Sequence, residues 1–250
     1  SSNWKEGYGY TVATEMYSAG IDRLTHQPLS FSVSETTEGV HIHIIDAELM
    51  GKGEKEKKDL YIEGVQNNGI INHYEYIINS EGTIEIRHVL KPEGKMPLWF
   101  PRIGLTLTVS DALDQVKWYG RGPQENYPDR KTGYPMGIYA STVQAMYEPY
   151  LMPQDYGLRT DVRWLQLTTD KGIGLQFKMN EWFNFNIYPY STDNLTKAMY
   201  TYQLQKQKGM TLNLDYATTG VGCTARGVFG AYKAMPQEYR RTISIRPMMK

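Results

Sequence analysis

Apolar and polar residues alternate along most of this chain, and this period of two limits its fold more than any other feature. Successive side chains of a β-strand point to opposite faces of the sheet, so an alternating segment predicts a strand with one buried face. About thirteen such segments occur, most of them bounded by Gly, Asn, Asp or Pro residues that favour turns. The cleanest are residues 29–34, 40–44, 83–87, 105–109, 175–177, 183–187, 212–214 and 242–245.

Helical periodicity is nearly absent from the sequence. The best candidate is a short helix over residues 191–199, which Ser191 or Thr192 could cap. A parallel βαβ fold requires a helix after each strand, so we exclude TIM barrels and Rossmann folds and expect an antiparallel sandwich or barrel. No repeat or linker interrupts the 250 residues, and we expect one all-β domain over residues 1–250.

Charge and composition exclude several classes of partner. Lys plus Arg and Asp plus Glu each number 27, so the chain has no excess positive charge for nucleic acid or an anionic membrane surface. No apolar run approaches the roughly 20 residues of a membrane-spanning helix, and residues 1–20 do not resemble a signal peptide. The mixed-charge run of residues 51–58 indicates a solvated hairpin loop. Because the chain does not begin with Met, it can be a processed or cut piece.

The pair Asn180-Glu181 resembles the Asn-Glu pair that places the acid/base carboxylate in many glycoside hydrolases. In those enzymes the pair ends a strand of a TIM barrel, whereas here it lies between Phe177 and Phe183, where we expect a hairpin turn. The sequence identifies no second carboxylate for it, although glycoside hydrolysis requires two. We therefore interpret the pair as ordinary turn residues.

His41 and His43 lie two residues apart on a predicted strand, so they share a face and could both bind a metal. No third ligand is obvious in the sequence, and structural zinc requires four. We therefore expect a solvent-facing pair and no metal site. The single cysteine, Cys223, excludes an internal disulfide, and it follows all five histidines, the last of which is His88. We expect an inert thiol.

Residues 120–163 are poor in alternation and rich in Pro, Tyr and charged residues, which is typical of a functional connection. Gly120 and Gly122 allow backbone conformations that are barred to other residues, and Pro123 and Pro128 stiffen the segment. Its charged residues are close enough in sequence to pair, and we favour a buried structural network over direct ligand contact. They are Arg121, Glu125, Asp129 and Arg130.

The same segment contains the run Gly122-Pro-Gln-Glu-Asn-Tyr-Pro-Asp-Arg130, with Asn126 and Tyr127 at its centre. This run, called the hallmark run below, closely resembles that of the C-terminal, small-chain domain of family 2 β-galactosidases. Nine contiguous residues with further matching blocks in order are far more specific than an isolated glycine motif. The further blocks are residues 17–20, 147–150, 153–157, 159–164, 183–191, 212–215 and 220–222.

The resemblance implies an antiparallel β-supersandwich related to galactose mutarotase, with very little helix. It also implies a parent enzyme that hydrolyses terminal, non-reducing β-D-galactose residues of β-galactosides with retention, using two glutamates. Those glutamates belong to a TIM-barrel catalytic domain that this sequence does not contain. We therefore expect the chain alone to be inactive and to buttress the barrel.

Partners and cofactors follow from the same resemblance. The expected partners are the TIM-barrel domain of the same polypeptide and a carbohydrate, and the parent can form homo-oligomers. The catalytic domain of the family can use Mg²⁺ or Na⁺, whereas we expect no cofactor or metal in this chain. The bacterial cytoplasm and the periplasm both stay open as its compartment.

One loop departs from the best-known branch of the family. There the loop reads Gly-Asp-Asp-Ser-Trp, and its Trp stacks on the sugar in the active site of the barrel. Here residues 220–227 read Gly-Val-Gly-Cys-Thr-Ala-Arg-Gly, so that the Trp position falls on Gly227. We expect Arg226 and Thr224 to bind substrate in its place, or Phe229 to supply the lost ring.

An alternative is a stand-alone sugar-binding or aldose-epimerase-like module that works from its own concave sheet. An epimerase requires a general acid and a general base over the sugar ring, typically a His and a Glu. The histidines fall outside the hallmark blocks, and none lies in a recognisable site. The accessory domain is therefore our first interpretation.

Overall fold

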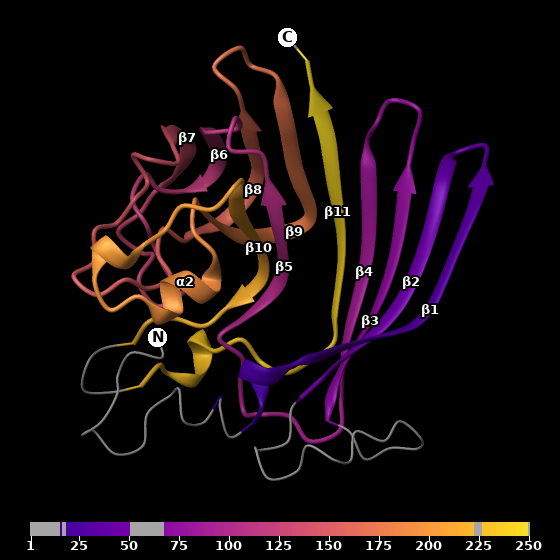
Figure 1. Ribbon diagram of the computed structural model, residues 1–250, viewed down its shortest axis with the longest axis horizontal. Coiled ribbons are helices and arrows are strands. Elements are labelled where there is room, and N and C mark those ends of the chain that lie inside the picture. The colour runs from indigo at the N-terminus through magenta and orange to yellow at the C-terminus, as the bar shows by residue number, and fades with distance from the viewer. Residues whose placement is uncertain (1–15, 17–18, 51–67, 223–226, 250) are drawn as a thin grey trace. The chain divides into compact units, whose positions relative to one another are not determined.

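The computed structural model describes residues 16, 19–50, 68–222 and 227–249, and this part of the chain is built mainly from antiparallel strands (Figure 1). The expected all-β fold class with very little helix is confirmed. The described residues form eleven strands, which are β1 (Thr25–Thr36), β2 (Gly39–Leu49), β3 (Gly69–Ile78), β4 (Ile84–Glu93), β5 (Arg102–Val109), β6 (Gln115–Arg121), β7 (Met136–Thr142), β8 (Arg159–Thr168), β9 (Gly174–Tyr188), β10 (Met210–Thr218) and β11 (Tyr239–Met248). The helical elements whose bounds lie within the described residues are α2 (Thr192–Lys197) and the 3-10 turns η1 (Ile21–Arg23), η3 (Thr201–Gln203) and η4 (Gly230–Tyr232).

The described residues divide into two compact units. The N-terminal unit contains residues up to 100 together with 235–244, and the C-terminal unit contains residues 101–234 together with 245–249. Strand β11 contributes to both units. The single-domain organisation expected from the sequence stays a prediction. No helix in the described ranges is long and apolar enough to cross a membrane.

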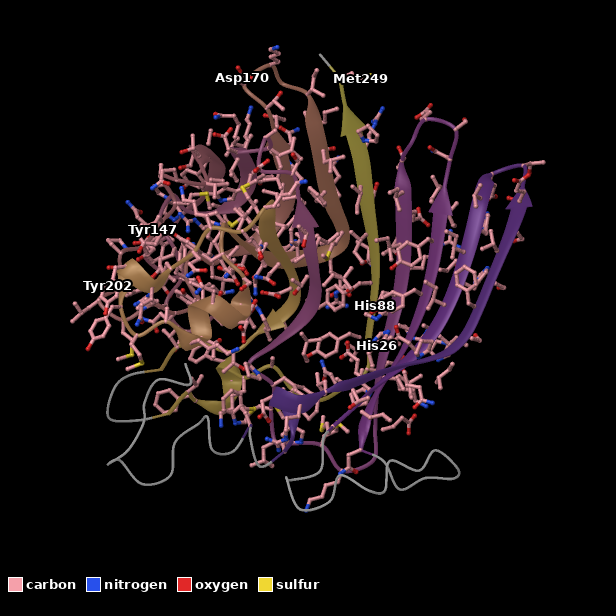
Figure 2. All side chains as sticks on the ribbon, in the orientation of Figure 1. His26, His88, Tyr147, Asp170, Tyr202 and Met249 are labelled. Atoms are coloured by element: carbon pink, nitrogen blue, oxygen red, sulfur yellow. The ribbon has the colours of Figure 1, made fainter. Side chains whose placement is uncertain are left out.

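In the N-terminal unit, β1 to β4 pair in sequence order, and every pair is antiparallel (Figure 2). The register places His43 opposite Glu75, and Glu75 opposite Arg87. Directly opposed residues project from the same face of a sheet, so a row of ionisable side chains crosses this face. The adjacent row, on the other face, carries Tyr74 and His88, whose ring centroids lie 4.1 Å apart.

The strands of the C-terminal unit follow the order β5, β10, β9, β8, β6, β7, and all of these pairs are antiparallel. The hallmark run directly follows β6, so it is attached to a strand of this packed unit. Large side chains from several strands form the core and are almost completely buried. They include Val116, Trp118, Leu165, Leu167, Phe177, Phe183, Phe185, Leu212 and Leu214.

The predicted short helix is confirmed as α2. The Ser191 hydroxyl accepts a hydrogen bond from the Asn194 N–H at 3.1 Å, as expected of an N-cap. The helix ends at Lys197 because Ala198 adopts an extended backbone.

Two edge strands differ from the sequence expectation. The apolar side chains of β1 are not buried, and Phe31 is 68% exposed. Among the described strands, β1 pairs with β2 alone. Strand β7 lies inside residues 120–163, where we expected no regular alternation. Its apolar residues Met136 and Ile138 face outward, so its pattern of hydrophobicity does not predict a buried face.

The hairpin turn expected at Asn180-Glu181 is wrong, because both residues lie within the continuous strand β9. The pairing of β9 with β8 shifts at this point, so that Trp164 opposes Lys178 while Val162 opposes Phe183. The extra residues of β9 form a bulge, which lengthens one strand locally without ending it.

Candidate functional site

The hallmark run leaves β6 and folds into a short turn that Tyr127 and Arg130 close. The N–H of Arg130 donates to the carbonyl of Tyr127 at 2.7 Å, and the N–H of Tyr127 donates back at 3.3 Å. The Arg130 guanidinium also lies over the Tyr127 ring, 5.1 Å from its centroid. The turn is therefore held by both backbone and side-chain contacts.

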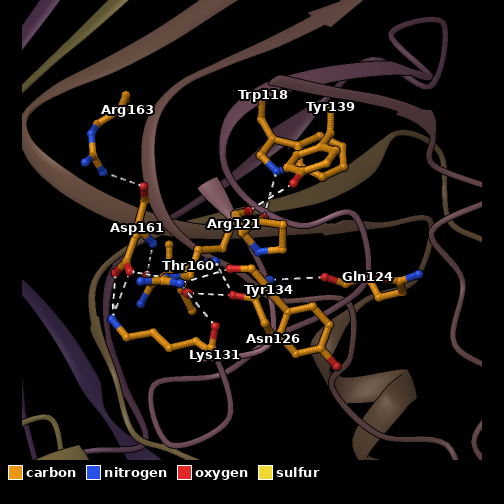
Figure 3. A network of polar contacts seen from close by, with 12 residues as sticks. Trp118, Arg121, Gln124, Asn126, Lys131, Tyr134, Tyr139, Thr160, Asp161 and Arg163 are labelled. Atoms are coloured by element: carbon orange, nitrogen blue, oxygen red, sulfur yellow. Dashed lines mark hydrogen bonds and ion pairs between the residues drawn. The ribbon is translucent and has the colours of Figure 1, made fainter. Parts of the chain in front are cut away.

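Arg121 holds the entrance of this turn (Figure 3). Its Nε donates to Asp161 Oδ2 at 2.6 Å, and Lys131 Nζ donates to Asp161 Oδ1 at 2.8 Å. Arg121 Nη1 also donates to the carbonyls of Lys131 and Tyr134, at 3.2 and 2.9 Å. The partner of Arg121 is thus not a carboxylate of the hallmark run, as the sequence suggested, but Asp161 on β8.

The backbone of Asp161 has a φ of 56°, in the left-handed region that few residues other than glycine adopt. The register between β8 and β9 shifts at the same place, between Arg159 and Val162, as in a bulge. Burial would raise the pKa of Asp161, but hydrogen bonds from Lys131 and Arg121, together with their charges, outweigh it and lower the pKa. The carboxylate stays ionised and ties the turn to β8.

Glu125 is buried, and its carboxylate accepts hydrogen bonds from four donors. Oε2 accepts from the Tyr127 hydroxyl at 3.0 Å and from the Gly157 N–H at 2.9 Å. Oε1 accepts from Arg130 Nη2 at 3.2 Å and from the Tyr150 hydroxyl. Burial, and then the bond to Glu125, raise the pKa of Tyr150 to about 12. Because its lone pairs are occupied, Glu125 organises the chain around it and is poorly suited to act as a base.

Asn126 is completely buried and joins the hallmark run to β8 (Figure 3). Its Oδ1 accepts from the N–H and the hydroxyl of Thr160, at 3.1 and 2.5 Å. Its Nδ2 donates to the carbonyl of Gln124 at 3.1 Å, and its backbone N–H donates to the carbonyl of Leu158 at 2.8 Å. Both ends of its amide are therefore satisfied, as a buried polar group requires.

Asp129 reaches the loop that departs from the family pattern. Its Oδ1 accepts from the N–H of Val221 at 3.1 Å, and its Oδ2 accepts from the N–H of Gly222 at 2.7 Å. A Cβ on Gly220 would lie 2.4 Å from Cγ of Asp129, so this close approach requires glycine. Asp129 thus fixes the start of the loop of residues 220–229.

The other end of this loop is fixed close to its start. The N–H of Gly220 donates to the carbonyl of Tyr232 at 2.9 Å, and the N–H of Ala234 donates to the Thr219 hydroxyl at 2.9 Å. Phe229 directly precedes η4, and its side chain is 75% exposed. The loop of residues 220–229 therefore carries the exposed ring of Phe229 next to its fixed base.

Cys223, Thr224 and Arg226 lie outside the described residues. The inert thiol at Cys223 and the substrate contacts of Thr224 and Arg226 therefore stay predictions. So does the solvated loop at residues 51–58, which is also outside the described part of the chain.

Gly120 and Gly122 allow close packing rather than an unusual backbone conformation. Neither has a positive φ. A Cβ on Gly120 would lie 2.8 Å from Cγ2 of Val162, and a Cβ on Gly122 would lie 3.0 Å from the Trp118 ring. The conformational interpretation of these glycines is therefore wrong, and close contact with β8 and with the Trp118 ring accounts for them.

The structure places a third potential metal ligand, Glu75, beside His41 and His43. The side chain of His41 is only 13% exposed, against 50% for His43, so the expected solvent-facing pair is wrong for His41. The sequence did not indicate Glu75 as a third ligand, because Glu75 lies on another strand. Alternation predicts that strand but not its register against β2.

Comparison with known proteins identifies the family. Residues 7–245 match the family model described as "Beta galactosidase small chain". The chain belongs to the β-galactosidase small-chain family. The hallmark run and its network lie within the matched residues.

The relatives of this small chain are much longer proteins. It is 38% identical over 147 residues to a β-galactosidase of Priestia megaterium, which covers 59% of this chain and 14% of that protein. It is 31% identical over 207 residues to a β-galactosidase of Vibrio cholerae, which covers 82% of this chain and 18% of that protein. The small chain thus spans less than a fifth of the length of these curated relatives.

Among solved structures, the small chain is similar to a GalM/aldose epimerase homologue from C. elegans, with a TM-score of 0.43 and 11% identity. That likeness covers 88% of this chain and 69% of the other. It is too distant to support any functional conclusion. The alternative of a stand-alone aldose-epimerase-like module therefore gains nothing from it.

Proposed function

We propose that this chain is the C-terminal accessory domain of a β-galactosidase that hydrolyses terminal β-D-galactose residues. In this proposal the chain supports the catalytic domain of the same polypeptide, and its loop of residues 220–229 forms part of the sugar-binding site of that domain. The observation that carries the proposal is the anchoring of that loop by the hallmark run, in which Asp129 accepts the N–H groups of Val221 and Gly222.

The hydrogen bonds that the carboxylates of the hallmark run accept support a non-catalytic role for this chain. Retaining hydrolysis requires two carboxyl groups roughly 5–5.5 Å apart that flank the sugar. Glu125 is occupied by four donors, and Asp129 accepts two backbone N–H groups. Both therefore serve to hold the chain, and we assign the catalytic glutamates, and any Mg²⁺ or Na⁺, to the catalytic domain of the parent.

The anchored loop is suited to substrate contact because its base is fixed and the exposed ring of Phe229 lies at its C-terminal end. An exposed aromatic ring can pack against the apolar face of a sugar. Arg226 offers a planar fork of donors for sugar oxygens, and Thr224 offers a hydroxyl. In this proposal these side chains add binding energy and take no part in bond cleavage.

The test is the kinetics of Phe229→Ala in the full-length polypeptide. We expect KM for an aryl β-galactoside to rise while kcat falls less, as is typical when ground-state binding is lost. Arg226→Ala should act in the same direction. Leu98→Ala is the matched control, since Leu98 is also an apolar side chain that is 75% exposed. Equal kinetics for all three variants and the parent would refute the role of the loop.

A further inference from the structure

Two histidines and a glutamate converge on one face of the sheet in the N-terminal unit. Nδ1 of His41 lies 3.6 Å from Oε1 of Glu75, and Nε2 of His43 lies 4.0 Å from the same oxygen. The potential ligand atoms of the three residues all lie within 4.8 Å of one another. Imidazole nitrogen and carboxylate oxygen are the donors that bind zinc in proteins.

The sheet itself brings these side chains together. His41 and His43 are two residues apart on β2, so both project from the same face. Glu75 lies directly opposite His43 on β3, and β2 and β3 are each paired on both sides. The three donors are thus fixed by inner strands of a sheet, which hold geometry better than loops do.

The separations suit a shared ion better than direct hydrogen bonds. Hydrogen bonds between nitrogen and oxygen span about 2.7–3.2 Å, and both histidine–glutamate distances are longer. Two ligands of a tetrahedral zinc ion, each about 2.0–2.2 Å from the metal, lie about 3.4 Å apart. A small inward movement of these side chains would therefore complete a coordination sphere.

Neighbouring charges hold the glutamate in the required orientation. Arg87 Nη1 donates to Oε2 of Glu75 at 3.1 Å, which leaves Oε1 turned toward the histidines. Arg87 Nε donates in turn to Glu85 at 2.8 Å, which balances the positive charge of Arg87. Such outer partners commonly orient the ligands of metal sites.

The second nitrogen of His41 supplies an independent observation. Its Nε2 is buried and has no hydrogen-bond partner among the described residues, and a carboxylate oxygen of Glu38 lies 3.9 Å away. A histidine that binds a metal through one nitrogen usually donates from the other to a carboxylate or a carbonyl. If Nδ1 of His41 binds the metal, the proton of the ring lies on Nε2. The Glu38 carboxylate would then move closer and accept a hydrogen bond from Nε2.

We propose that His41, His43 and Glu75 form a zinc site, with water in the fourth position. Two imidazoles and one carboxylate favour zinc over Mg²⁺, which prefers an all-oxygen set. The half-exposed His43 leaves a side open for the ion to enter. The bound ion would link β2 to β3 on one face of the sheet, and Tyr74 and His88 lie on the other face. This proposal departs from the sequence expectation of no metal in the chain.

The test is calorimetric titration of ZnCl₂ into the 250-residue chain after treatment with a chelator. We expect one zinc ion per chain and a higher thermal midpoint of unfolding with zinc, since a ligand that binds only the native state stabilises it. MgCl₂ should give neither effect. Glu38→Gln should weaken zinc binding about tenfold, at the lower end of the range for outer partners.

His43→Ala is the decisive variant, because this half-exposed side chain can be removed with little effect on folding. We expect it to lose zinc binding while its zinc-free thermal midpoint stays unchanged, and Glu75→Gln should also lose binding. His26→Ala is the matched control, since His26 is an exposed histidine on β1 outside the cluster. Unchanged zinc affinity in His43→Ala, equal loss in His26→Ala, or no zinc binding by the parent chain would each overturn the proposal.

Discussion

At the scale of single residues, Glu125 and Arg130 form an ion pair whose two members are unequally buried. The side chain of Glu125 is 9% exposed and that of Arg130 is 51% exposed. Removing Glu125 leaves several buried donors without an acceptor, whereas removing Arg130 exposes one carboxylate oxygen to water. The sequence alone could not show which of the two partners is buried.

We expect Glu125→Ala to lower the free energy of unfolding by about 3–5 kcal/mol, as is typical of a broken buried pair. Arg130→Ala should cost about 1 kcal/mol or less, since water replaces a half-exposed arginine. Urea unfolding of the 250-residue chain measures both values. An equal or larger loss in Arg130→Ala would contradict the network described for Glu125.

His88 gives a second prediction at this scale, through pH. The ring is 2% exposed, and its Nε2 lies 3.0 Å from Oδ1 of Asn72, whose Nδ2 donates to Asp46 at 2.9 Å. The Asn72 oxygen therefore faces the ring and accepts a hydrogen bond from Nε2 of His88. Burial, and then the charge of His73, lower the pKa of His88 from 6.5 to about 4.

The unfolded chain takes up a proton on His88 near pH 6.5, whereas the native chain does so only near pH 4. The native state should therefore lose of order 3 kcal/mol of stability from this residue as the pH falls from 6.5 to 4. His88→Gln keeps a donor but cannot titrate, so its unfolding free energy should depend less on pH in this window. Parallel pH profiles for His88→Gln and the parent would show that His88 does not titrate in this way.

At the scale of elements, the close contact between Gly220 and Asp129 holds the start of the loop of residues 220–229. Gly220→Ala would push the Asp129 carboxylate away from the N–H groups of Val221 and Gly222. We expect this change to cost about 1–3 kcal/mol, since two backbone donors lose their acceptor. A thermal or urea unfolding curve of the 250-residue chain measures the loss.

Gly227→Ala is the matched control for this loop. A Cβ on Gly227 would meet no atom of the described residues within 4 Å, so the same chemical change should leave the unfolding midpoint nearly unchanged. If both variants unfold at the same midpoint as the parent, Asp129 does not anchor the loop.

The elements also show what the sequence can and cannot predict. Alternation predicted the strands, and the Ser191 cap predicted α2, because both signals are local. Alternation did not predict β7, whose apolar side chains face outward. It also predicted two separate segments where the structure has the single strand β9, because a bulge interrupts the pairing of β9 with β8. The Arg121–Asp161 contact could not be predicted either, because it depends on which strands become neighbours.

At the scale of the whole molecule, the model of the small-chain family matches residues 7–245, which is nearly the entire sequence. The chain itself spans less than a fifth of the length of its β-galactosidase relatives. The hallmark run allowed this family to be predicted from the sequence, because nine contiguous residues are specific. The cluster of His41, His43 and Glu75 could not be predicted, since it requires the register of β2 against β3.

Turnover of an aryl β-galactoside by the purified 250-residue chain, beside the full-length polypeptide, tests the central claim most directly. We expect hydrolysis by the full-length polypeptide and none by the chain, since the hallmark carboxylates hold structure and the catalytic glutamates are assigned to another domain. Hydrolysis by the chain alone, abolished by Glu181→Gln, would contradict the account of an accessory domain.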